Sequence, residues 1–148
     1  MTYLKVTAVA INQTPMDWQG NRMRIQEAFD EAVGNHSSIV CFPELCITGY
    51  GCEDHFHSED LQQRALSMLD AICVLTTTED HTLTTRANCT TVVCVGLPLM
   101  FRNALYNVIA VIQGGDVLGF VAKQHLAGTE FTMSPVGSRR GPQGIRRQ

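Results

Sequence analysis

The sequence lacks any apolar run that could cross a membrane, because no stretch approaches the roughly 20 consecutive apolar residues of a spanning helix. The apolar run at the N-terminus is also too short for a signal peptide. These absences argue against a membrane partner and predict a cytoplasmic location. The sequence also has no internal repeat, and no low-complexity tract precedes the C-terminal segment.

Closely spaced cysteine motifs are missing as well. The six cysteines form no C-x-x-C pair and show no zinc-ligand spacing with the five histidines. We therefore expect reduced thiols and no metal site. Cys41 and Cys94 lie inside apolar strand patterns, where a free cysteine acts as a small hydrophobic residue. His55 and His57 lack a convincing set of further ligands, which makes them weak metal candidates.

Positive charge is scarce over most of the chain. Through Gly137 the sequence has 7 basic and 14 acidic residues, and four arginines among the last ten residues bring the net charge to −3. This balance predicts no nucleic-acid partner. The change in composition indicates a boundary near the C-terminus.

The 148 residues, 45% of them hydrophobic, are enough for one compact domain with a sizeable core. Their hydrophobic pattern alternates between strand and helix periods, and the first strand, helix and second strand form a βαβ unit with a parallel pair. Pro98 is expected to end the third strand, and Gly114-Gly115 indicates a hairpin before the fifth. We predict strands at 4–11, 39–42, 91–97, 105–112 and 117–122, helices at 21–33 and 59–72, and loops at 46–57 and 76–90.

Glu44 and Lys123 each lie at the end of an apolar strand pattern. Charged residues at such positions gather at the functional edge of an α/β sheet, which makes Glu44 a candidate catalytic base. A pair of solvated strand ends fits the same spacing, so the residue pattern leaves both alternatives open. On the same evidence Tyr50 is more typical of packing than of a pocket, and Glu53 with Asp54 of a solvated loop.

Three segments together carry a resemblance to a known family. They are AINQTPMDWQGNRMRIQEAFDEA, IVCFPELCITGYGCED and VGLPLMFRNALYNVIAVIQGGDVLGFVAKQHLAG. Their order and content resemble the nitrilase (carbon-nitrogen hydrolase) superfamily, and within it the glutaminase domain of glutamine-dependent NAD synthetases. The resemblance covers roughly residues 4–128.

The resemblance implies an α/β fold, of which this chain is the N-terminal portion of a four-layer αββα sandwich. It implies a Glu-Lys-Cys triad, with Glu44 as general base and Lys123 as the group that stabilises the oxyanion. Tyr50 is implied to shape the substrate pocket. In the family a cysteine thiolate attacks the glutamine amide, and the ammonia released serves NAD synthesis.

The sequence departs from the family at the nucleophile. The family's nucleophilic cysteine follows the lysine, and residues 124–148 contain no cysteine. Cys46 precedes Lys123 in the chain, so we do not expect it to take the place of the nucleophilic cysteine. We therefore expect a carbon-nitrogen hydrolase domain in residues 1–128 that is inactive by itself, followed by a non-family tail in residues 129–148. A change of reading frame near the Gly128 codon is one hypothesis for this tail.

Partners and alternatives follow from the same resemblance. The implied substrate is glutamine or another small amide, and we expect no cofactor in this segment. A sheet face left without its second sheet is expected to promote self-association. Another nitrilase-superfamily amidase with a different substrate remains open, as does a non-catalytic remnant or binding module.

Overall fold

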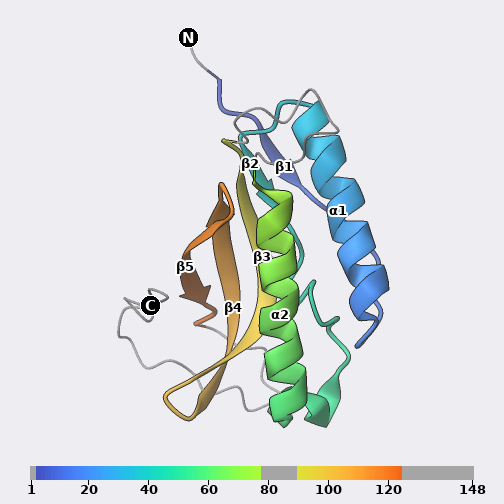
Figure 1. The fold of residues 1–148 in the computed structure, drawn as a ribbon, viewed down its shortest axis with the longest axis vertical. Coiled ribbons are helices and arrows are strands. Elements are labelled where there is room, and N and C mark those ends of the chain that lie inside the picture. Colours follow the sequence, from blue (N-terminus) through green and yellow to red (C-terminus); the bar gives the residue numbers. More distant parts are fainter. Residues whose placement is uncertain (1–2, 78–89, 125–148) are drawn as a thin grey trace.

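The computed structural model describes residues 3–77 and 90–124. Within these residues two long helices lie on one side of a single sheet, as Figure 1 shows. The elements in chain order are β1 (Val6–Ala8), α1 (Trp18–Gly34), β2 (Ile39–Cys41), the 3-10 helix η1 (Glu53–His57), α2 (Glu59–Leu75), β3 (Val92–Phe101), β4 (Ala104–Gln113) and β5 (Asp116–Ala122).

The five strands of the sheet follow the chain order from β1 to β5. The first three strands run parallel, and β4 and β5 are each antiparallel to the strand before them. This confirms the predicted βαβ unit. The connections β1–α1–β2 and β2–α2–β3 are both parallel crossovers, and both step in the same direction along the sheet. Because such crossovers are right-handed, their two helices lie on the same face.

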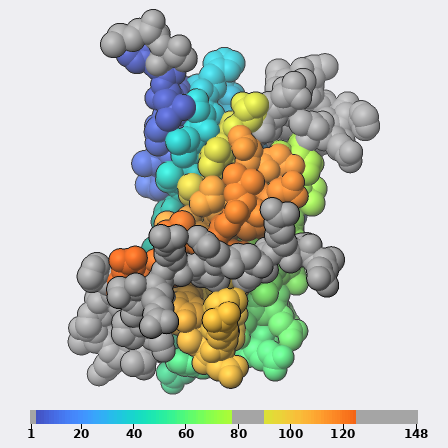
Figure 2. All heavy atoms as spheres, turned by 90° about the vertical axis from the view of Figure 1, so that its left-hand side faces the viewer, coloured from blue at the N-terminus to red at the C-terminus, as the bar shows by residue number. Residues whose placement is uncertain are grey.

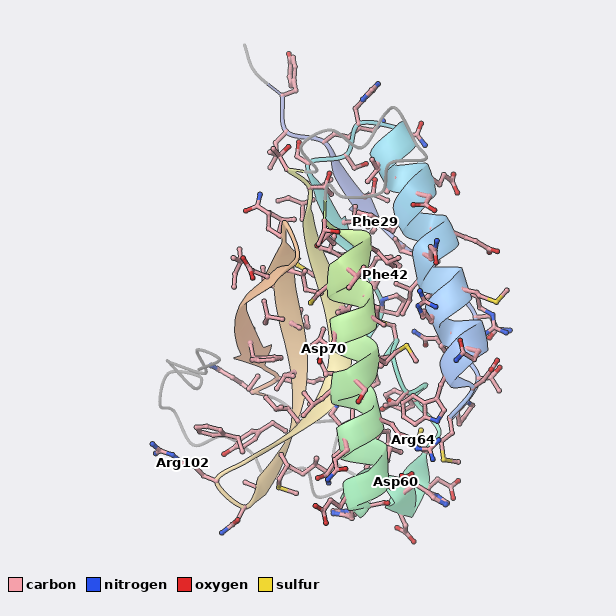
Figure 3. All side chains as sticks on the ribbon, in the orientation of Figure 1. Phe29, Phe42, Asp60, Arg64, Asp70 and Arg102 are labelled. Atoms are coloured by element: carbon pink, nitrogen blue, oxygen red, sulfur yellow. The ribbon has the colours of Figure 1, made fainter. Side chains whose placement is uncertain are left out.

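The core lies between this face and the two helices. Phe29 of α1 and Phe42, which follows β2, both point into it (Figure 3), and they are 2% and 7% exposed. Aliphatic side chains from both helices and the central strands fill the rest. The largest fully buried ones include Ile25, Ile72, Val40, Val95 and Leu97. The outer side of α2 is polar, and an ion pair joins Arg64 to Asp60 at 3.0 Å (Figure 3).

No helix or strand among the described residues covers the other face of the sheet, which the turn after β2 crosses over Gly96. Val6, Ile109 and Val121 point to this side by their pairing register, and 56%, 41% and 59% of their surfaces are exposed. Figure 2 looks from the left-hand side of Figure 1 and shows atoms of β4 and β5, in orange, at the molecular surface. We call this apolar side of the sheet the open face.

The first predicted helix begins three residues earlier than expected. The side chain of Asp17 accepts a hydrogen bond from the backbone N–H of Gly20 at 3.0 Å, which caps α1 at Trp18. Ser58 precedes α2, but its side chain makes no capping hydrogen bond. Part of the predicted loop at 46–57 is regular, since residues 53–57 form η1.

The prediction that Pro98 ends the third strand is wrong. β3 continues through Pro98 to Phe101 and stays paired with β4. A proline cannot donate a ladder hydrogen bond, and it is tolerated where one side of the strand is unpaired. Pairing between β2 and β3 ends at Cys94, so Pro98 has a partner strand only on the β4 side. The missing amide hydrogen therefore leaves the ladder intact.

The C-terminal predictions fall outside the part of the chain that the structure describes. The boundary at Gly128, the tail at 129–148 and most of the loop at 76–90 belong to this group. Among the described helices, none has both the length and the apolar composition needed to cross a membrane. The cytoplasmic location stays a prediction.

Candidate functional site

The topology brings the ends of β2 and β5 to the same edge of the sheet. β2 is parallel to β3, and two antiparallel steps from β3 give β5 the same direction again. Glu44 lies in the turn after β2, and Lys123 directly follows β5. Both residues therefore lie at the carboxyl edge of their strands, where α/β folds place their ligands.

Three strand spacings separate β2 from β5, or about 14 Å at the usual distance between neighbouring strands. The chain covers part of this gap by crossing over β3 directly after β2. Gly96 of β3 makes the crossing possible, because a Cβ there would lie 2.4 Å from the backbone nitrogen of Leu45 and 3.0 Å from the carbonyl oxygen of Pro43. The backbone N–H of Ile47 also donates to the Gly96 carbonyl at 3.2 Å.

The crossing lets Glu44 meet Lys123. The ammonium Nζ of Lys123 donates to Oε1 of Glu44 at 2.8 Å and to Oε2 at 2.9 Å. Each side chain keeps 37% of its surface exposed. The two charged strand ends predicted from the sequence are therefore one ion pair, and this pair is open to a ligand from solvent.

Asn107 of β4 contacts both members of the pair. Its side-chain amide donates to Oε1 of Glu44, and its backbone carbonyl accepts from the backbone N–H of Lys123 at 2.9 Å. Asn107 is only 7% exposed. Oε1 thus accepts from two donors while Oε2 accepts from one, which leaves Oε2 with lone-pair capacity for a further proton or hydrogen bond.

Sequence reasoning missed Asn107 and Gly96. Both had a signal: Asn107 is the polar residue inside the apolar run LYNVIAVI, and Gly96 is a glycine inside a strand. A glycine within a strand often marks a close approach of another backbone segment. The signals did not say which segment approaches, because that depends on the register of the strands.

The other predicted residues lie apart from these contacts. Tyr50 lies in the loop between β2 and η1 with 62% of its surface exposed, so its role in a substrate pocket stays a prediction. His55 and His57 are exposed on η1. The described residues contain no group of three or more histidine, cysteine or acidic side chains that could hold a metal ion.

Three of the described thiols, those of Cys46, Cys52 and Cys94, are poor nucleophiles at neutral pH. Cys46 is fully buried, and burial raises the pKa of its thiol to about 12. Its sulfur accepts from the Gly96 N–H at 3.3 Å, which makes it part of the crossing between the turn and β3. Burial also raises the pKa of Cys52, and burial together with the neighbouring Cys41 raises that of Cys94 to about 11. A thiolate is the reactive form of cysteine.

The family model for carbon-nitrogen hydrolases matches residues 5–144. The chain therefore belongs to the carbon-nitrogen hydrolase family. Among curated relatives it is similar to the glutamine-dependent NAD(+) synthetase of Rattus norvegicus, with 33% identity over 123 residues, which cover 82% of this chain and 15% of the relative. It is also similar to the enzyme of the same name from Aquifex aeolicus, with 34% identity over 83% of this chain and 20% of the relative.

Solved structures show the same relationship. A glutamine-dependent NAD(+) synthetase from Cytophaga hutchinsonii is 36% identical, with a TM-score of 0.73, and the match covers 84% of this chain and 19% of that one. An amidase from Nesterenkonia sp. shares the fold at 18% identity and a TM-score of 0.70, over 93% of this chain and 49% of that one. The chain thus has a partial nitrilase-like α/β fold, as predicted.

Proposed function

We propose that this chain supplies the base and the oxyanion-stabilising amine of a glutamine-hydrolysing site whose ammonia serves NAD synthesis. The observation that carries the proposal is the Glu44–Lys123 ion pair at the carboxyl edge of the sheet, 2.8 Å between Oε1 and Nζ. Relatives named as glutamine-dependent NAD(+) synthetases support the choice of glutamine as the amide.

Each group has a defined task in amide hydrolysis. Oε2 of Glu44 has room to accept the proton of an attacking nucleophile, while Asn107 and Lys123 fix the orientation of the carboxylate. The Lys123 ammonium has three donors, and a donor not used by Glu44 is available to an amide oxygen as negative charge develops on it. General base catalysis and charge stabilisation therefore come from one pair.

The attacking sulfur has to come from elsewhere. In two mutants of the Nesterenkonia amidase, acrylamide and the acetamide moiety of fluoroacetamide add to an active-site cysteine. This sequence has no cysteine after Lys123, and Cys46 is buried with a pKa raised to about 12. We expect that these 148 residues alone release no ammonia from glutamine, since base and amine without a nucleophile form no acyl intermediate.

A chimera tests the proposal. Residues 5–124 of this chain replace the corresponding segment of the Cytophaga hutchinsonii synthetase, whose remaining residues complete the domain. We expect ammonia release from glutamine, lowered by about 100- to 10,000-fold in Glu44→Gln and by about 100- to 1,000-fold in Lys123→Met. Ammonia-supported NAD synthesis by the same chimeras is the folding control and should not change.

The outcomes separate the proposal from its alternatives. Glutamine hydrolysis that survives both substitutions would refute the roles of Glu44 and Lys123. Loss of glutamine hydrolysis with retained cleavage of small aliphatic amides would favour an amidase with another substrate. A well-folded chimera without any amide hydrolysis would favour a non-catalytic remnant, because the segment would then lack a working base.

A further inference from the structure

We propose that Cys41 and Cys94 form a two-sulfur binding site for a soft cation that accepts two ligands, such as Cu(I). The two residues are direct partners on adjacent parallel strands, in the register Cys41 to Cys94. Side chains at paired positions point to the same face of a sheet. The two thiols are neighbours that interact with each other, and both are half-buried.

The thiol pair is accessible from the open face. The row of paired positions across the sheet at this level runs Ala8, Cys41, Cys94, Val111 and Gly119. Ala8 and Gly119 at the ends of this row are small, and Ala8 is exposed. Both described helices pack on the other face (Figure 1), and the two cysteines are half-buried and not fully buried, so a small ion can reach the sulfurs from the open face.

The donor set selects the type of ion. Thiolates are soft ligands that favour ions such as Cu(I) and Zn(II), whereas carboxylate and carbonyl oxygens suit harder ions such as Mg²⁺. A structural zinc ion takes four protein ligands. The described residues offer no group of three or more metal-binding side chains, so only two sulfurs are available. This favours an ion that is satisfied by two ligands.

The spacing is compatible with a bridging ion. Paired residues of adjacent strands lie about 4.8 Å apart, and their side chains leave the sheet side by side. Two metal–sulfur bonds of roughly 2.3 Å each span at most about 4.6 Å between the sulfurs, which two such side chains can supply. The same strand spacing also lies within the range of Cα distances of disulfides, about 4.4–6.8 Å, so the donor set and not the spacing selects the ion.

Binding needs no oxidant or reductant. Each thiol loses its proton to solvent as its sulfur forms a bond to copper, and the ion keeps its oxidation state. One Cu(I) thus displaces two protons and leaves a complex with a charge of one minus. This inference does not depend on the proposed glutamine hydrolysis.

Competition with a coloured Cu(I) chelator in the absence of oxygen tests the site. The protein is the full chain with Cys89→Ser, because Cys89 lies outside the described residues. We expect one tightly bound Cu(I) per chain, with two sulfur neighbours and no third ligand in X-ray absorption. Cys41→Ser and Cys94→Ser should each lower the Cu(I) affinity by at least about 100-fold. Loss of a group that only hydrogen-bonds to a metal ligand costs about 100-fold at most, so a larger effect indicates a direct ligand.

Val92→Ser is the matched control, since Val92 lies two residues before Cys94 in the same strand, on the same face and half-buried. It should keep full Cu(I) affinity. The serine variants and Cys94→Ala should give the same far-UV circular dichroism spectrum as the unchanged chain. A loss of Cu(I) binding is then not a loss of folding. Unchanged affinity in both serine variants, or a third ligand at copper, would overturn the proposal.

Discussion

Asn107 connects the two charged groups of the candidate site, because its side chain holds Glu44 and its backbone carbonyl holds the backbone of Lys123. Asn107→Ala removes only the side-chain contact. In the chimera we expect kcat/KM for ammonia release from glutamine to fall by about 100-fold, the effect of a misplacement of about 1 Å. Asn107 acts here as a positioning residue.

The control for this variant is Ile109→Ala, two residues along the same strand and on the same face, where 41% of the side chain is exposed. It should leave kcat/KM unchanged. Asn107→Gln restores the amide donor on a longer side chain and should recover part of the activity. A structural effect alone would lower ammonia-supported NAD synthesis as well, and that result would contradict the positioning role.

Cys46 gives the chain a pH-dependent stability. Because burial raises its pKa from 9.0 to about 12, the folded state keeps this proton at a pH where the unfolded state has lost it. The stabilising contribution is complete below pH 9 and falls as pH rises toward 12, by about 1.4 kcal/mol per pH unit for one such group. Urea unfolding at pH 8 and pH 10 should show a smaller decrease in Cys46→Ala than in the unchanged chain. Equal decreases in the free energy of unfolding in the two chains would show that folding does not raise the pKa of the Cys46 thiol.

The residues that the sequence could identify are those that break a local pattern. Glu44 and Lys123 are charges at the ends of apolar strand patterns, and the structure joins them at 2.8 Å. The contact of Asn107 with Glu44 spans 63 positions of the chain. It depends on the register between β3 and β4 and on the path of the turn after β2, and neither is visible in a local pattern.

At the level of elements, the crossing of the Glu44 turn over β3 depends on Gly96. Gly96→Ala places a Cβ 2.4 Å from the backbone nitrogen of Leu45, so either the turn or the strand must move. We expect a loss of about 1–3 kcal/mol in the free energy of unfolding, as for other overpacked sites, measured by urea denaturation. In the chimera the same substitution should also reduce ammonia release, because it displaces Glu44 from Lys123.

Gly119→Ala is the matched control, since it adds the same methyl group to a strand glycine that has no atom within 4 Å of the added Cβ. It should be neutral or slightly stabilising, because alanine restricts the unfolded chain. If Gly96→Ala is as stable as Gly119→Ala, the turn does not pack on β3 as described.

Helices and hairpins differ in how far their sequences determine them. The 3.6-residue period predicted both α helices, and Gly114-Gly115, with φ of 59° and 89°, predicted the turn between β4 and β5. The turn between β3 and β4 was not predicted. It uses Arg102 and Asn103 at φ of 48° and 61°, a conformation that usually indicates glycine. Packing of the two long strands overrides the local preference there.

At the scale of the whole molecule, the resemblance predicted the partial nitrilase-like fold, and the comparison with the amidase bears it out over 93% of this chain and 49% of the amidase. The hydrophobic periodicity of the sequence could not distinguish the two apolar faces of the sheet. One face packs against α1 and α2, whereas Val6, Ile109 and Val121 on the open face remain largely exposed. Strands that are apolar on both faces are typical of sheets buried on both sides.

No helix or strand among residues 3–77 and 90–124 covers the open face, and in a pure sample another copy of the chain can cover it. We therefore expect concentration-dependent self-association in sedimentation velocity, as sheets packing face to face bury such surfaces. Ile109→Lys combined with Val121→Lys should reduce it, because burying two unpaired charges is costly. Leu66→Lys is the control, since Leu66 is 40% exposed on α2, on the opposite side of the sheet. Equal self-association in both variants would show that copies associate through another surface.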